Sequence, residues 1–205
     1  MGHKPAQRLK LTAAIASEAG RIMANETVDD FHTAKLKARD RLGLGKDAPL
    51  PSNREVQQAR DQHLQLFTPH DQLVDFSETK LRNAVEALEF FSQFQAKLVA
   101  DFLDHPVSST ETLKLHLQSD NVESVALLLD DHALLYEQAL TSVRLGQHNF
   151  ASVPVFSLTV NGQDYSILVF SSIQIRQAPR DPVTGGGQTR IGLDEAKLRL
   201  SQFAN

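Results

Sequence analysis

The sequence predicts an α+β protein in which a helical N-terminal unit, residues 1–95, precedes a mixed-sheet α/β domain, residues 96–205, that ends in a loop and a short helix. Apolar residues recur at helical spacing through the first part of the chain and alternate at strand spacing after Gln95. No glycine interrupts the chain between Gly45 and Gly146. The hydrophobic content of 41% and the charged content of 22% are those of an ordinary globular protein.

The first two helices are predicted from periodicity and from their end signals. An apolar stripe indicates a helix from about Arg8 to Asn25, on Leu9, Ala13, Ala16, Ala19, Ile22 and Met23. A second helix, Phe31 to Leu42, follows Asp29 or Asp30, whose carboxylates can accept from the first-turn N–H groups. Gly43 can adopt the left-handed conformation that ends the helix.

Two further helices complete the N-terminal unit. Pro49 and Pro51 break the pattern, and Ser52 with Glu55 forms a capping-box signature for a third helix that reaches Phe67. The fourth helix is predicted from His70 to about Phe94, which makes it the longest element.

The second part of the chain begins with a predicted β-α-β unit. The strands are expected at Lys97–Leu103 and Thr112–Gln118, and in the second of these Leu113, Leu115 and Leu117 face one way. Asp120 with Glu123 is expected to cap the helix that follows.

A meander and a short helix complete the predicted sheet domain. We expect a strand from about Leu134 to Leu145, and then a hairpin whose turn is Asn161-Gly162, since Asn-Gly favours a type I′ turn. A flexible loop precedes a last helix, which begins at Leu193 or Asp194 and ends at Ser201.

Composition excludes several classes of function. The chain has no cysteine, so disulfides, thiol catalysis and Cys-ligated zinc are excluded, which fits a cytoplasmic protein. No apolar run is long enough to span a bilayer, and the N-terminus has no signal-peptide pattern, so no membrane partner is expected. The net charge is −4, but residues 1–60 hold 11 Lys and Arg against 7 Asp and Glu.

The basic excess at the N-terminus raises the possibility of nucleic-acid binding. Four cations lie on the second predicted helix: Lys35, Lys37, Arg39 and Arg41. They are candidates for phosphate contacts, although the sequence favours a solvated face, because charged runs usually coat surfaces. Stacking on single strands has little support, because the chain has no Trp and only two Tyr.

The order of elements resembles the minimal nucleotidyltransferase fold. Over nearly its full length the chain is also similar to a family of uncharacterised bacterial nucleotidyltransferase-like proteins. The segments that carry this resemblance are AAIASEAGRIMANE, FHTAKLKARDRLGL, LPSNREVQQA and LVFSSIQIRQAPRDPV.

The resemblance implies a site that has lost its metal ligands. Active members of the fold place a Gly-Ser loop after the first strand, two carboxylates on the second and one on a later strand, because two Mg²⁺ ions need oxygen ligands. Here the loop positions hold His105 and Pro106, the paired positions hold Thr112 and Lys114, and the last falls near Ser166. An ammonium at such a position would repel the ions.

Nearby carboxylates are not expected to rescue the metal site. Glu111 and Asp164 lie one or two positions from the expected ligands, and a shift of one residue along a strand turns a side chain to the other face. We therefore expect no catalytic residue, no metal and no cofactor.

The functional hypothesis is a noncatalytic nucleotidyltransferase-like domain that binds a protein partner or a phosphate-bearing ligand. Lys114 with Arg176 and Arg190 could form an anion site, since guanidinium groups suit phosphate. The alternatives are an active nucleotidyltransferase with a rearranged metal site, and nucleic-acid binding through the basic helices. His116, on the polar side of its strand, is expected to be a surface or hydrogen-bonded residue rather than a ligand.

Overall fold

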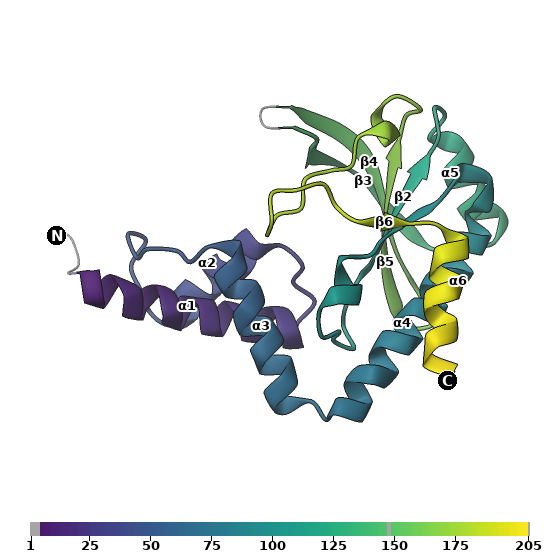
Figure 1. The fold of residues 1–205 in the computed structure, drawn as a ribbon. Coiled ribbons are helices and arrows are strands. Elements are labelled where there is room, and N and C mark those ends of the chain that lie inside the picture. Colours follow the sequence, from purple (N-terminus) through teal and green to yellow (C-terminus); the bar gives the residue numbers. More distant parts are fainter. Residues whose placement is uncertain (1–4, 147–148, 205) are drawn as a thin grey trace. The chain divides into compact units, whose positions relative to one another are not determined.

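The computed structural model describes residues 5–146 and 149–204 and confirms the α+β class: N-terminal helices precede a six-stranded mixed sheet (Figure 1). The chain forms two compact units. The helical unit comprises the chain up to Leu73 with Pro106–Glu111 and Pro182–Thr184, and the sheet unit comprises Val74–His105, Thr112–Asp181 and the chain from Gly185.

Three helices build the helical unit: α1 Pro5–Asn25, α2 Phe31–Arg41 and α3 Asn53–Phe67. Their shared core contains Ile15, Ala16, Ala19, Ile22, Phe31, Ala34, Ala38 and Val56. The predicted stripe of α1 is right over its middle and wrong at its start, because Leu9 and Ala13 are exposed. The buried face begins at Ile15 instead.

The predicted ends of α2 and α3 are confirmed. Asp30 caps α2 by accepting from the N–H of Thr33 at 2.7 Å, and Gly43 follows the helix with a φ of 65°. Ser52 accepts from the N–H of Glu55 at 3.2 Å, while the Glu55 carboxylate accepts from the N–H of Ser52 at 2.7 Å. These bonds pair N–H groups that the helix itself leaves without partners.

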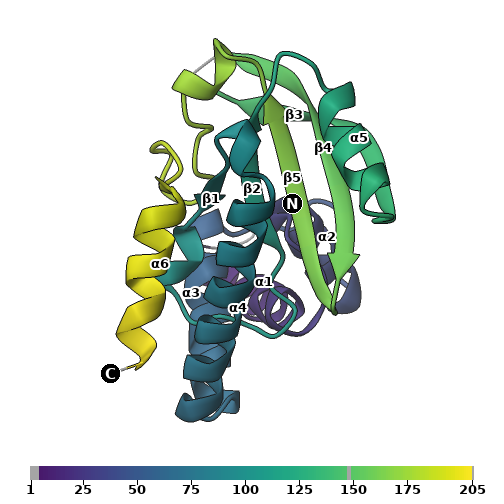
Figure 2. The same cartoon turned by 90° about the vertical axis from the view of Figure 1, so that its right-hand side faces the viewer.

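Helix α4, His70–Phe90, ends before the predicted Phe94, and a 3-10 turn, Ser92–Phe94, follows it. From Val74 onward the helix belongs to the sheet unit. Its apolar face carries Leu81, Ala84, Val85 and Leu88, which are buried in the core of that unit. Figure 2 shows α4 and α6, Leu193–Ser201, lying across the sheet.

The sheet has the strand order β3-β4-β5-β2-β1-β6. Strand β2 is parallel to β5, and the other neighbours are antiparallel. The strands are β1 Lys97–Val99, β2 Leu113–Gln118, β3 Tyr136–Arg144, β4 Phe150–Val160, β5 Gln163–Phe170 and β6 Arg190–Ile191. The hairpin prediction is confirmed, since Asn161 and Gly162 have φ values of 50° and 78° between β4 and β5.

Two local predictions in the sheet unit are wrong. The strand predicted to reach Leu103 ends at Val99, and Asp101–Asp104 forms a 3-10 turn instead. The strand ends there because Ala100 leaves the extended conformation, with φ −103° and ψ 18°, and its carbonyl oxygen accepts from the N–H of Leu103 in the 3-10 turn. Asp120 does not cap α5, Glu123–Asp131, because its carboxylate accepts from the N–H of Ser172 at 2.9 Å.

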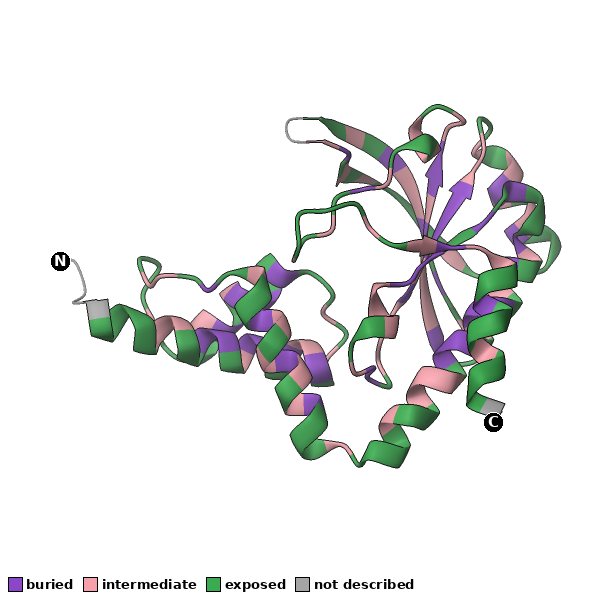
Figure 3. Ribbon diagram, in the orientation of Figure 1, coloured by how far each residue is buried: buried purple, intermediate pink, exposed green. Residues whose placement is uncertain are grey.

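The two faces of the sheet differ in character. On one face Leu113, Leu115 and Leu117 join Ile167 and Val169 in a core that α4, α5 and α6 cover. Figure 3 shows this buried layer along the strands and the facing sides of the helices. The opposite face carries the alternate positions, because successive residues of a strand point to opposite sides, and it combines polar side chains with a second, smaller core that contains Val153 and Phe170. Within the described ranges, no helix is long and apolar enough to cross a membrane.

Candidate anion-binding face

The polar face of the sheet gathers cations from three neighbouring strands. Lys97 on β1 pairs with His116 on β2, and Val99 pairs with Arg190 on β6. One step further along the β1–β2 ladder, Lys114 comes opposite Val99, so Lys97, Lys114 and Arg190 share a face. We call the face formed by Lys97, Lys114, His116, Ser166 and Arg190 the cationic face.

Lys114 and Ser166 are direct partners in the parallel ladder of β2 and β5. The resemblance places a metal-binding carboxylate at each of these two positions. Both side chains are half-buried. The register therefore places an ammonium and a hydroxyl side by side.

His116 lies at the centre of the cationic face. It is 2% exposed, its neighbours across the ladders are Lys97 and Leu168, and its ring meets Phe170 edge-on with a centroid separation of 4.9 Å. Burial, with the charge of Arg190 as a second cause, lowers the pKa of His116 to about 3. The expectation of a surface histidine is wrong, because the strand is buried on both faces at this position, and Nδ1 has no hydrogen-bond partner among the described atoms.

Arg190 contacts the backbone carbonyl of the residue that precedes Arg176. The Arg190 guanidinium donates to the carbonyl oxygen of Ile175 at 3.0 Å, and Arg176 is the next residue in the 3-10 turn Gln174–Arg176. Arg190 is half-buried, and this burial lowers its pKa, whereas Arg176 is exposed. The structure thus places Arg190 on the cationic face and the backbone of Arg176 beside it.

Carboxylates also lie close to Lys114. Burial raises the pKa of Asp101, and the charge of Asp181 raises it further, whereas the N–H of Thr189, Lys114 and His105 act to lower it. The Thr189 N–H donates to Asp101 at 3.3 Å. Asp101 is thus a counter-charge for Lys114. Across the described residues, no group of three or more His, Asp or Glu side chains has a metal-binding arrangement.

The two neighbouring carboxylates considered from the sequence have other partners. Glu111 forms an ion pair with Arg60 inside the helical unit, and Asp164 accepts from the Thr159 hydroxyl at 2.6 Å on the adjacent strand. Neither contact contributes a carboxylate to the Lys114–Ser166 pair.

The four cations of α2 have local partners as well. Lys35 is buried and donates to the side-chain oxygen of Asn53, so it is not on an exposed face. Lys37 and Arg41 both bond to Glu26, at 2.8 Å and 2.6 Å, and Arg39 contacts Asp40 at 3.1 Å. The charge on this helix is therefore largely balanced within the unit.

Sequence patterns alone did not single out Lys97 or Asp101. Alternation along β1 could have placed Lys97 with Val99, but the sequence does not state which strand lies beside β1. Comparison of the chain with protein-family models, with curated proteins and with solved structures found no match.

Proposed function

We propose that the sheet unit is a noncatalytic nucleotidyltransferase-like domain that binds a phosphate-bearing ligand on its cationic face. The observation that carries this proposal is the convergence of Lys97, Lys114 and Arg190 on one face of three neighbouring strands. Ammonium and guanidinium groups are the usual partners of phosphate oxygens.

Partial burial makes such contacts stronger than contacts on an open surface. Lys114 and Arg190 are half-buried, and the lowered pKa of Arg190 reflects the cost of holding its charge away from water. A bound anion would offset this cost by pairing with the charge in a region of low dielectric constant. The Ser166 hydroxyl, beside Lys114, can donate to the same ligand.

The buried Nδ1 of His116 is a second, independent observation in favour of a ligand. A buried nitrogen without a hydrogen-bond partner is costly, and few such atoms occur in folded proteins. A phosphate group that enters far enough to reach this buried atom could pair with it in either tautomer, since an N–H donates to a phosphoryl oxygen and a bare nitrogen accepts from P–OH.

One observation favours a second candidate, a nucleotide bound together with a divalent cation. Asp181 is close enough for its charge to raise the pKa of Asp101, and Mg²⁺ is often held by one or two carboxylates together with substrate phosphates. This candidate corresponds to the rearranged metal site. It requires the divalent cation to strengthen binding.

Calorimetric titration with pyrophosphate and with ATP, each with and without Mg²⁺, separates the two candidates. We expect saturable binding of pyrophosphate to the wild type without Mg²⁺, and a loss of about tenfold in affinity for Lys114→Gln and for Arg190→Gln. Arg82→Gln removes an equally basic but exposed side chain from α4 and is the matched control. It should leave the affinity unchanged.

Two results would reject the metal-free proposal. The first is binding that occurs only with Mg²⁺ and is lost in Asp101→Asn, which would establish the metal-dependent candidate. The second is an affinity that falls equally in Arg82→Gln and Lys114→Gln, which would show that only overall charge matters.

A further inference from the structure

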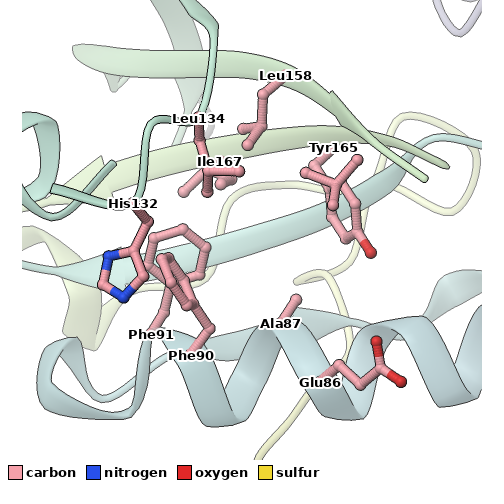
Figure 4. A pocket seen from close by; sticks show the side chains of 10 residues that line it. Glu86, Ala87, Phe90, Phe91, His132, Leu134, Leu158, Tyr165 and Ile167 are labelled. Atoms are coloured by element: carbon pink, nitrogen blue, oxygen red, sulfur yellow. The ribbon is translucent and has the colours of Figure 1, made fainter. Parts of the chain in front are cut away.

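The sheet unit contains a cavity on the face opposite to the cationic face. It has a volume of about 340 Å³ and lies between α4 and strands β4 and β5 (Figure 4). Phe90 at the end of α4, the next residue Phe91, and Leu158 and Ile167 of the sheet form much of its wall. Its volume equals that of about eleven molecules of liquid water, and apolar walls of this kind hold water poorly.

The polar groups at this cavity accept hydrogen bonds. His132 Nδ1 lies 2.9 Å from the carbonyl oxygen of Leu128, which can only accept, so Nδ1 donates and Nε2 of the neutral ring is an acceptor. The Tyr165 hydroxyl donates to the Asn83 carbonyl at 3.4 Å, which leaves its oxygen lone pairs as acceptors. Glu86 supplies a carboxylate at the rim.

The acceptors lie at opposite ends of the cavity. Figure 4 shows the Tyr165 hydroxyl and the Glu86 carboxylate toward one end, His132 at the other, and the phenylalanine rings near His132. Burial raises the pKa of Tyr165 to about 12, and the charge of Glu86 adds to this effect, so the phenol stays protonated at neutral pH. The end of the cavity near Glu86 and Tyr165 therefore combines a carboxylate charge with a neutral hydroxyl oxygen that can accept a hydrogen bond.

We infer that this cavity binds a small molecule with an apolar body and a primary amine. Its ammonium group lies at the Glu86 and Tyr165 end, where both oxygens accept from it, and its apolar body packs against Phe90, Phe91 and Ile167. A carboxylate of the same size is disfavoured, because it would meet Glu86 with a like charge.

A cation already present on α4 does not occupy this end. Lys80 is buried, and its ammonium donates to the Gln163 side-chain oxygen at 2.6 Å. Lys80 is not among the residues that line the cavity.

Tyrosine fluorescence gives a direct measurement of binding. The chain has no Trp and two Tyr, so Tyr136→Phe leaves Tyr165 as the only strong emitter, and it lies in the cavity wall. The probes are 4-phenylbutylamine, 4-phenylbutanol and 4-phenylbutyrate, which share one body and differ in charge. We expect the amine to bind about fivefold more tightly than the alcohol, and the carboxylate to bind most weakly.

Two variants and a control locate the site. Glu86→Gln should bring the amine and the alcohol to the same affinity, and Ala87→Phe should abolish binding of both by filling the cavity. Asp75→Asn removes an exposed carboxylate elsewhere on α4 and should behave as the Tyr136→Phe background does. If Ala87→Phe does not fold, the site is located instead by NMR, from shifts of the Ile167 and Leu158 methyl signals on addition of the amine.

The inference is overturned by equal affinity for the three probes, by preference for the carboxylate, or by a preference for the amine that persists in Glu86→Gln. Absence of any fluorescence or methyl shift at millimolar amine would also overturn it. The cationic face does not enter this experiment, so its failure and the failure of the proposed phosphate binding are independent.

Discussion

Arg190 and His116 share one face of the sheet, and the guanidinium charge adds to burial in lowering the pKa of the imidazole to about 3. The two residues lie on β6 and β2, with β1 between them. The pair therefore places a permanent cation near a histidine that stays neutral down to acidic pH.

His116 should make the protein sensitive to acid. Its pKa is about 3 in the folded chain against an ordinary value of 6.5, so the unfolded chain binds an extra proton between these values. Above pH 6.5 the imidazole is neutral in both states and does not reduce the free energy of unfolding. As the pH falls toward 3, that free energy decreases, because only the unfolded chain takes up the proton. We expect this residue alone to reduce the free energy of unfolding by about 2 kcal/mol between pH 7 and pH 5.

Urea denaturation of the wild type and of His116→Leu at pH 7 and pH 5 measures this contribution. The leucine variant should lose less stability between the two values. His70→Leu, at an exposed histidine, is the control. The account of His116 is wrong if its replacement leaves the pH dependence unchanged.

The Arg60–Glu111 ion pair should stabilise the helical unit strongly. The Arg60 side chain is 7% exposed, and it also contacts Asp61 at 3.7 Å and the Pro106 carbonyl at 3.4 Å. Glu111→Ala leaves a buried cation with weaker partners, so we expect a loss of about 3 kcal/mol. Glu18→Ala, at the more exposed pair with Arg21, should cost less than about 1 kcal/mol.

Hydrogen exchange of buried amides in α1 and α3 measures both losses within the helical unit. Equal effects of Glu111→Ala and Glu18→Ala would contradict the assigned role of the buried pair.

Gly20 permits close packing of α1 on α3. A Cβ at this position would lie 2.6 Å from the Arg60 nitrogen and 2.7 Å from the Ala59 carbonyl carbon, both backbone atoms. Alanine favours a helix over glycine by about 1 kcal/mol, but overpacking costs about 1 to 3 kcal/mol. We expect Gly20→Ala to destabilise the unit in the same exchange experiment, whereas exposed Ser17→Ala should not. A stabilised Gly20→Ala protein would contradict the close approach.

Glu26 should titrate far below its ordinary range. Hydrogen bonds from Arg41 and Lys37 lower its pKa to about 2. The stabilisation from these contacts is present above the ordinary value of 4.5 and is lost as the pH falls toward 2. Carbon NMR titration should show this shift in the wild type and a return toward 4.5 in a Lys37→Ala, Arg41→Ala variant. An ordinary Glu26 pKa in the wild type would mean that the cations of α2 are available to other partners.

Local sequence signals determined the elements that the structure confirms. The Ser52–Glu55 box and the Asn161-Gly162 turn depend on a few adjacent residues, so the sequence states them directly. By contrast, the early end of β1 depends on packing, because Phe102 and Leu103 of the following 3-10 turn lie against the core of the sheet unit. Periodicity shows that α4 has a buried face, but it does not show what that face packs against.

The candidate site was predicted in part. Lys114 and Arg190 were chosen for their chemistry, and the strand order then places them on one face. The burial of His116 could not be predicted from alternation, because the sequence does not show whether the second face of a strand is covered. Lys97 and Asp101 could not be assigned to the candidate site from the sequence, because only the folded chain brings them near Lys114.

A chemical-shift map of the ¹⁵N-labelled protein with pyrophosphate tests the central claim most directly, because it reports binding and position together. The proposal predicts saturable amide shifts at Lys97–Val99, Leu113–Gln118 and Arg190–Ile191, together with a change in the His116 ring-nitrogen signal. Shifts confined to Phe31–Arg41 would place the anion on α2 instead. That result, or the absence of shifts at millimolar pyrophosphate, would contradict phosphate binding on the cationic face.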